Sequence, residues 1–299
     1  ESKKIFDKIE LNTNKLKEIA KVSFGIKLYE VGQGKPIQTK ETVLNKPYSH
    51  KSKINKNCRK LLEGKSIDRY ETNFNGNWLE YGEWIAAPRK KEMFEGERIV
   101  LRRIVGKEGL ISQYLKDDYV NNSLLHVVKL YNELYYTKFV LSILNSKLIG
   151  FYFISKYARK EKTFPEIRIH ELESLPIKIT EKLKQTSFVI LVDYLLHLYN
   201  KENPAILLHT DNTRIASHIE DILNMMVYEL YFEEHMKEVD LDVLQFVTPV
   251  IENLQNLPIE QQIKELYEWY QKPENAVRQR MMLIDTRSPD ILAVIHKSM

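Results

Sequence analysis

Lysine and arginine side chains are mixed with aromatic ones in several stretches of the first 165 residues. Such cations neutralise phosphates and release counterions, and arginine can also bind guanine through two parallel hydrogen bonds. The mixture favours a surface that binds duplex DNA, although a basic face that is merely solvated has the same composition. The residues concerned are Lys51, Lys53, Lys56, Arg59, Lys60, Lys65, Arg69, Tyr70, Arg89, Lys90, Lys91, Arg98, Arg102, Arg103, Tyr157, Arg159, Lys160, Lys162 and Phe164.

The chain lacks the parts from which a site for methyl transfer to a DNA amine is built. Such a site needs a glycine-rich cofactor loop and an Asn/Asp-Pro-Pro-aromatic element that holds the flipped base. The only Asn-Pro pair, Asn203-Pro204, continues into Ala205, and Gly32 and Gly34 lack the flanking strand and helix of a nucleotide-binding loop. We therefore expect neither an S-adenosylmethionine site nor a catalytic residue in this chain.

Acidic residues and histidines offer little for a nuclease or zinc site. The segment 95–97 and the pair Asp117-Asp118 are short acidic turns, and adjacent acids at a turn are usually solvated. The eight histidines show no HExxH spacing. No metal site is predicted, and a metal-dependent nuclease without a familiar motif is the least favoured alternative.

Cysteine usage and hydropathy indicate a cytoplasmic protein. Cys58 is the only cysteine, so an intrachain disulfide cannot form. No apolar run approaches the ~20 residues that a membrane span needs. The first residues are polar and do not begin with methionine, so we expect a fragment of a larger chain.

Charge is unevenly distributed, although the net charge is only +4. Residues 1–180 contain 34 Lys and Arg against 22 Asp and Glu, whereas residues 181–299 contain 11 against 19. This asymmetry predicts that the first part contacts a polyanion and that the second serves as a scaffold or a protein contact. Charge that simply varies along the chain is the alternative.

Hydrophobic patterns predict an α+β fold with two parts. A mixed α/β domain, 1–180, with a twisted and mainly antiparallel sheet, is followed by a helical region, 181–299. Residues 35–60 are expected to be loops, and residues 135–155 a buried helix broken near Asn145-Ser146. Strands are predicted at 84–88, 98–105, 110–115, 124–130 and 167–170, and helices at 188–198, 215–232, 241–254 and 259–270.

Several segments resemble, in order, the TaqI-like specificity domain that follows the catalytic domain in type IIG restriction-modification enzymes and related methyltransferases. The resemblance spans roughly residues 11–180, and a helix at 219–232 resembles one that often follows this domain, with Phe232 where glycine is common. Each motif is loose by itself, and their order carries the resemblance. The segments are 16–27, 61–70 (LLEGKSIDRY), 78–81, 97–104 (ERIVLRRI), 136–148 (YTKFVLSILNSKL), 164–169 and 175–177.

The resemblance implies a module that grips duplex DNA and reads its major groove, while a separate domain flips adenine for methyl transfer. S-adenosylmethionine and Mg²⁺ would belong to the catalytic methyltransferase and nuclease domains of the parent enzyme. Arg69 and Tyr70 could either contact DNA or orient a loop. The predicted DNA-binding residues are Lys27, Lys53, Lys56, Lys65, Arg69, Tyr70, Arg89, Lys90, Arg102, Arg103, Arg159, Lys160 and Lys162.

Two other classes remain open at this point. A type I specificity subunit has similar recognition domains and no catalysis, but it normally carries two of them separated by long paired helices. A helical protein-interaction module with an incidental basic face belongs to a different class altogether. Salt-dependent binding to DNA distinguishes the two classes of DNA-recognition protein from the protein-interaction module.

Overall fold

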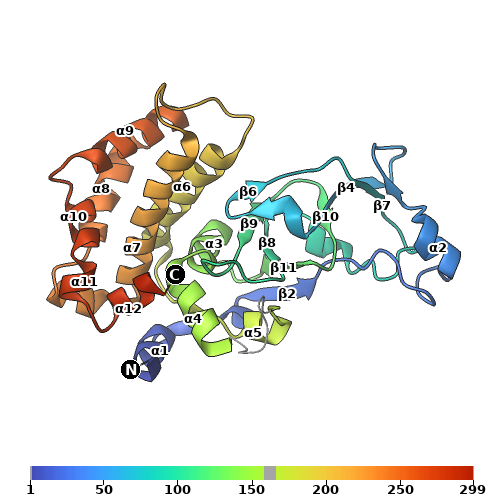
Figure 1. Cartoon of the computed structure of the whole chain (residues 1–299), viewed down its shortest axis with the longest axis horizontal. Coiled ribbons are helices and arrows are strands. Elements are labelled where there is room, and N and C mark those ends of the chain that lie inside the picture. The colour runs from blue at the N-terminus through green and yellow to red at the C-terminus, as the bar shows by residue number, and fades with distance from the viewer. Residues whose placement is uncertain (1, 158–165, 299) are drawn as a thin grey trace.

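The computed structural model describes residues 2–157 and 166–298 of the chain. Sheets occupy one side of the molecule, and most of the helices from the C-terminal part lie together on the other side (Figure 1). The sheets are mainly antiparallel. The predicted α+β class is therefore confirmed.

Four antiparallel strands form a central sheet in the order β2-β11-β8-β9. Along β8, Ile99 and Leu101 belong to a first hydrophobic core, and Val100 between them belongs to a second. Successive side chains of a strand point to opposite faces, so this sheet is buried on both faces. The strands are β2 (Ala20–Phe24), β8 (Arg98–Arg102), β9 (Ser112–Leu115) and β11 (Leu125–Leu130).

A distal sheet in the order β10-β4-β7-β3 covers the second core. Its inner side chains include Leu61, Leu79 and Val120, which pack with Phe94. Only the pair β10–β4 runs parallel. The strands are β3 (Ser49–His50), β4 (Cys58–Leu62), β7 (Trp78–Glu80) and β10 (Tyr119–Asn121); two small antiparallel pairs are formed by β5 (Ile67–Asp68) with β6 (Glu71–Thr72) and by β1 (Thr13–Lys15) with β12 (Pro176–Lys178).

The first core continues from the central sheet into the helices. It includes Ile5 near the N-terminus, Phe139 beside the sheet and Ile295 near the C-terminus. Helix α3 packs on β8 and β9 and also against α6 and α7. The helices are α1 (Ser2–Glu10), α2 (Lys40–Asn45), α3 (Thr137–Leu144), α4 (Lys147–Tyr157), α5 (Ile169–Glu173), α6 (Lys182–Tyr199), α7 (Asn212–Glu238), α8 (Leu244–Leu254), α9 (Ile259–Gln271), α10 (Ala276–Met282), α11 (Ile284–Arg287) and α12 (Leu292–Lys297).

In the described parts of the chain, no single helix is long and apolar enough to cross a membrane. Helices α3 and α4 reach that length and composition only as a pair, across a bend of 58°. Most of their side chains are buried in the protein.

Most predicted elements are present, and three local predictions are wrong. The hairpin of β8 and β9 and the helix break between α3 and α4 are confirmed. Residues 84–88 form only an isolated bridge, because Pro88 has no N–H to donate and Arg89 turns the chain with φ of 62°. Segment 167–170 is not a strand: α5 begins there, and the Glu171 carboxylate accepts a bond from the Arg168 N–H.

Segment 35–60, expected to be loops, contains α2, β3 and the start of β4. Helix α2 begins where the Thr39 hydroxyl accepts a hydrogen bond from the Thr42 N–H at 3.2 Å. The division of the chain at residue 180 stays a prediction.

Asn145 joins the break between α3 and α4 to the central sheet. Its side chain accepts from the Ser112 N–H and donates to the Ser112 carbonyl, each at 2.9 Å in a buried setting. Asn145→Ala should lower the free energy of unfolding by about 1–3 kcal/mol, because the buried Ser112 N–H loses its partner and the Ser112 carbonyl keeps only the Tyr70 N–H, at 3.3 Å. Urea denaturation measures this loss. Asn253→Ala, on the exposed side of α8, should stay within about 0.5 kcal/mol of the wild type.

Candidate nucleic-acid interface

Two of the predicted DNA contacts, Arg69 and Arg102, hold backbone carbonyls. Arg102 Nε donates to the Ile67 carbonyl at 2.8 Å, and Arg69 Nε donates to the Leu110 carbonyl at 3.1 Å. Arg69 also contacts the backbone and the carboxylate of Glu108. These bonds fix the β5–β6 hairpin to the central sheet and to the loop after β8. Both guanidinium groups therefore stabilise the structure. Of the two roles considered for Arg69, the structure favours the one in which it orients a loop.

Tyr70 belongs to the first core. Its side chain is 2% exposed and stacks on Tyr199 of α6, with ring centroids 6.5 Å apart. Its φ of 57° places it in the left-handed region, where the chain reverses between β5 and β6. Burial leaves this ring no surface from which to contact DNA.

Arg103, Arg89 and Lys27 are partly engaged by their neighbours. Arg103 pairs with Glu166 at 3.2 Å and lies over the Phe24 ring. Arg89 Nε donates to the Gly25 carbonyl at 3.2 Å. Lys27 pairs with Glu30 at 2.7 Å. Exposed ion pairs of this kind are weak, so Lys27 and Arg103 can still exchange their partners for a phosphate.

Four predicted lysines are exposed and have no ion-pair partner within the described ranges: Lys53, Lys56, Lys65 and Lys90. Lys53 and Lys56 lie in the loop between β3 and β4, whereas Lys65 follows β4 and Lys90 precedes a short 3-10 turn at 91–94. The structure therefore does not gather all predicted residues at one point. Arg159, Lys160 and Lys162 lie outside the described residues.

The outer face of the distal sheet carries a row of residues that the sequence analysis did not predict to lie together. The strand register places His50, Trp78, Lys60 and Tyr119 side by side on four neighbouring strands. We call these four residues the Lys60 row. Lys60 Nζ lies 5.4 Å from the ring centroids of both Phe74 and Tyr119, a cation–π arrangement.

Two hollows flank the Lys60 row. The larger, about 650 Å³, is lined by Lys60, Phe74, Tyr119 and Gln113, together with Lys201 from beyond α6. Glu71, Asp117 and Glu202 also line it, so its charge is mixed.

The smaller hollow, about 250 Å³, is lined by Lys46, His50, Lys51, Asn77 and Trp78, among others. Its basic residues lie beside aromatic rings, which is the combination that suits nucleic acid.

The loop between β6 and β7 contributes residues to both hollows and is held by amide contacts. Asn75 and Asn77 both donate to the Glu63 carboxylate, at 3.3 and 3.0 Å. Lys51 Nζ donates to Asn77 at 2.7 Å. Asparagine side chains can pair with base edges, so this loop brings hydrogen-bonding groups beside the cations and rings of the Lys60 row.

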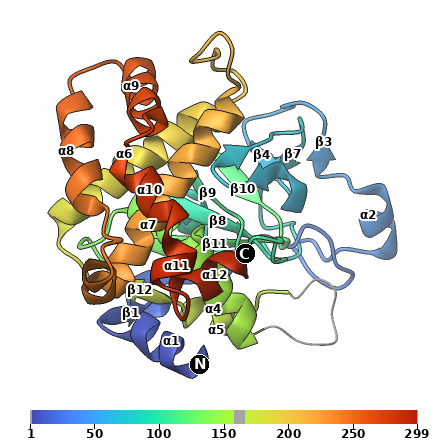
Figure 2. The same ribbon diagram turned by 60° about the vertical axis from the view of Figure 1, so that its left-hand side comes forward.

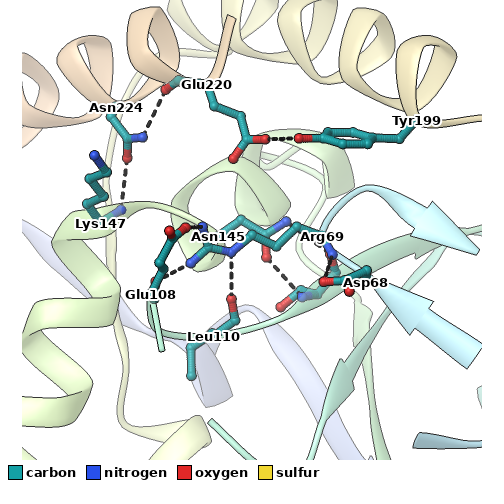
Figure 3. Close-up of polar contacts among 10 residues, drawn as sticks. Asp68, Arg69, Glu108, Leu110, Asn145, Lys147, Tyr199, Glu220 and Asn224 are labelled. Carbon is teal, nitrogen blue, oxygen red and sulfur yellow. Dashed lines mark hydrogen bonds and ion pairs between the residues drawn. The ribbon is translucent and has the colours of Figure 1, made fainter. Parts of the chain in front are cut away.

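A partly buried polar network links α4, α6 and α7 beside Arg69 and Asn145. Figure 3 shows Tyr199 and Glu220 on helices that face Arg69 and Asn145. Tyr199 Oη donates to Glu220 at 2.5 Å, and Asn224 links α7 to the Lys147 N–H at 2.8 Å. Burial raises the pKa of the Glu220 carboxyl, while the bond from Tyr199 and the charge of Arg69 oppose that rise.

The sheets carry this mixed aromatic and cationic face and are backed by helices, which is an α+β arrangement on a helical support. Residues 59–177 match the family model of the TaqI-like C-terminal specificity domain. The match covers 119 of the 299 residues, and over these residues the predicted resemblance is confirmed. Such a domain is a DNA target-recognition module of restriction-modification enzymes. No match to a curated protein was found.

Arg69→Ala tests whether this side chain is a scaffold or a DNA contact. Removing the bond to the Leu110 carbonyl should lower the free energy of unfolding by about 1–3 kcal/mol, because it leaves that carbonyl without a partner. Lys53→Ala, at an exposed position, should change it by less than about 0.5 kcal/mol. Equilibrium urea unfolding compares the two. An Arg69→Ala protein of wild-type stability that binds DNA poorly would favour the contact role instead.

Glu220→Gln tests the buried carboxyl. Because its pKa is raised in the folded state, the folded protein retains a proton that the unfolded chain has already released above pH 4.5. The wild type should therefore lose stability relative to Glu220→Gln as pH rises from 4.5 to the raised pKa, with no further change above it. Tyr199→Phe removes a bond that lowers this pKa, so it should extend the window upward. Thermal unfolding across pH 4–8 is the measurement, and a constant difference would contradict the assignment.

Proposed function

We propose that this chain recognises a specific sequence in double-stranded DNA through the distal sheet and its loops. The observation that carries the proposal is the Lys60 row, three of whose four residues lie within the match to the TaqI-like specificity domain. Lysines around this face, including Lys53, Lys56 and Lys65, would neutralise phosphates. The aromatic rings and the amides of the β6–β7 loop would lie toward the bases.

In this proposal the chain positions DNA for a catalytic partner domain of a type IIG restriction enzyme that methylates adenine at N6. S-adenosylmethionine and Mg²⁺ would be bound by that partner. The residues of the present chain contribute the grip on the duplex and its register, and Arg69 and Arg102 keep the hairpin and loops in place. The single cysteine, Cys58, is compatible with a reducing cytoplasm, where we place the protein.

Binding selection from a random duplex library tests the function. The purified chain should enrich a short site, and fluorescence anisotropy on that duplex should show affinity that falls steeply with salt. Replacing Lys53 and Lys56 together by Gln should weaken binding and reduce the logarithmic salt slope by roughly 0.9 for each phosphate that is no longer neutralised. Lys264→Gln with Lys272→Gln, on and after α9, is the matched control and should leave the slope unchanged.

The same experiment separates the other classes. Enrichment of a site in two halves separated by a fixed spacer would favour a type I specificity subunit. No enrichment, no anisotropy change and no thermal shift with added duplex would reject DNA recognition and favour a helical protein-interaction module.

A further inference from the structure

The loop between α6 and α7, residues 200–211, is a projecting element of the helical side. Both views show it extending beyond the ends of these two helices (Figures 1 and 2). Its tip carries three consecutive apolar residues, Ile206, Leu207 and Leu208. The first two pack against the first core, whereas Leu208 is 96% exposed.

Internal hydrogen bonds fix the shape of this loop. Leu207 and Thr210 form an antiparallel bridge, which places Leu208 and His209 at the tip of a tight turn. Asn212 accepts from the Ile206 N–H and donates to the Pro204 carbonyl, each at 3.0 Å. Leu208 is therefore presented on a preorganised support, and little ordering entropy remains to be lost when it meets a ligand.

The base of the loop is attached to the recognition domain. Lys201 Nζ pairs with Glu71 at 2.6 Å and donates to Asn73 at 2.9 Å. Lys201 and Lys60 line the same larger hollow. A duplex lying along the Lys60 row therefore meets the base of this loop at that hollow.

The chemistry of the tip suits close approach to DNA. The tip itself, residues 203–210, carries no carboxylate, and the two acids of the loop, Glu202 and Asp211, stand at its ends. Single exposed apolar residues are common on protein surfaces. Leu208 differs in its nearly complete exposure, its rigid turn and the link from the loop base to the DNA-facing hollow. Apolar side chains of this type can enter between base pairs and kink the duplex.

We propose that Leu208 is a wedge that inserts between base pairs of the duplex held on the Lys60 row. The inference rests on the proposed DNA recognition and extends it to the helical side, which then contributes directly to DNA deformation. Intercalation unstacks one base step, and the new apolar contact and the bend offset the loss of stacking. The flexible pyrimidine–purine steps are the sequences that this wedge would favour.

The test uses the full chain and the duplex recovered by selection, labelled with 2-aminopurine at successive positions. Wild-type protein should raise 2-aminopurine fluorescence at one step, and dyes at the two duplex ends should report a bend. Leu208→Ser should abolish both signals and weaken binding about tenfold, while the salt slope stays unchanged because every phosphate keeps its cation. Leu208→Met, which keeps an apolar side chain of similar length, should retain both signals.

Leu183→Ser, at an 81% exposed position near the start of α6, is the matched control and should behave as wild type. Wild-type binding without unstacking at any position, or a Leu208→Ser protein equal to wild type, would overturn the wedge and leave DNA recognition standing. A wild-type chain that binds no duplex would overturn the proposed function and the wedge together.

Discussion

Side chains of β8 alternate between two hydrophobic cores, and the rest of the structure depends on this burial of one sheet from both sides. Ile99 and Leu101 connect the sheet to α3 and the long helices, while Val100 connects it to the distal sheet. Each full burial of such a side chain contributes about 1.5–3 kcal/mol. The strand therefore sets the position of the distal sheet relative to the helical support.

Polar groups divide into two sets according to this architecture. Arginines near the centre, such as Arg98 and Arg102, donate hydrogen bonds to carbonyls at strand ends and turns. Burial lowers the pKa of the Arg98 guanidinium to about 10, which leaves it charged at neutral pH. Lysines toward the periphery, such as Lys53 and Lys65, remain exposed. Arginine suits these inner positions because its planar guanidinium group can donate hydrogen bonds to two acceptors at once. The exposed lysines are free for a diffuse partner such as a phosphate backbone.

The elements that could be predicted from the sequence are those whose own residues show a clear hydrophobic pattern or helix break. The apolar runs at 98–105 and 110–115 predicted the β8–β9 hairpin, and Asn145-Ser146 predicted the helix break. The Lys60 row could not be predicted in this way. It depends on pairing β4 with β10, which lies far along the chain, and on strands as short as β3, which has two residues.

The roles of individual basic residues could not be predicted from the sequence either. Arg69 and Arg102 occur in the same kind of basic stretch as Lys53, yet only the tertiary arrangement brings the carbonyls of Leu110 and Ile67 within their reach. Tyr70 resembles an exposed aromatic in its polar surroundings, but the ring of Tyr199, from a helix distant in the sequence, covers it. Composition alone therefore could not separate the basic residues that hold the framework from those that remain on the surface.

The second core has an evolutionary consequence. It is a separate cluster beneath the distal sheet, whereas the first core joins the central sheet to nearly every helix. The β3–β4 and β6–β7 loops contribute only Phe74 to the second core and none of their described residues to the first. Under the proposed function, a lineage could change its target sequence through these loops, because they share little packing with the core that joins the central sheet to the helices.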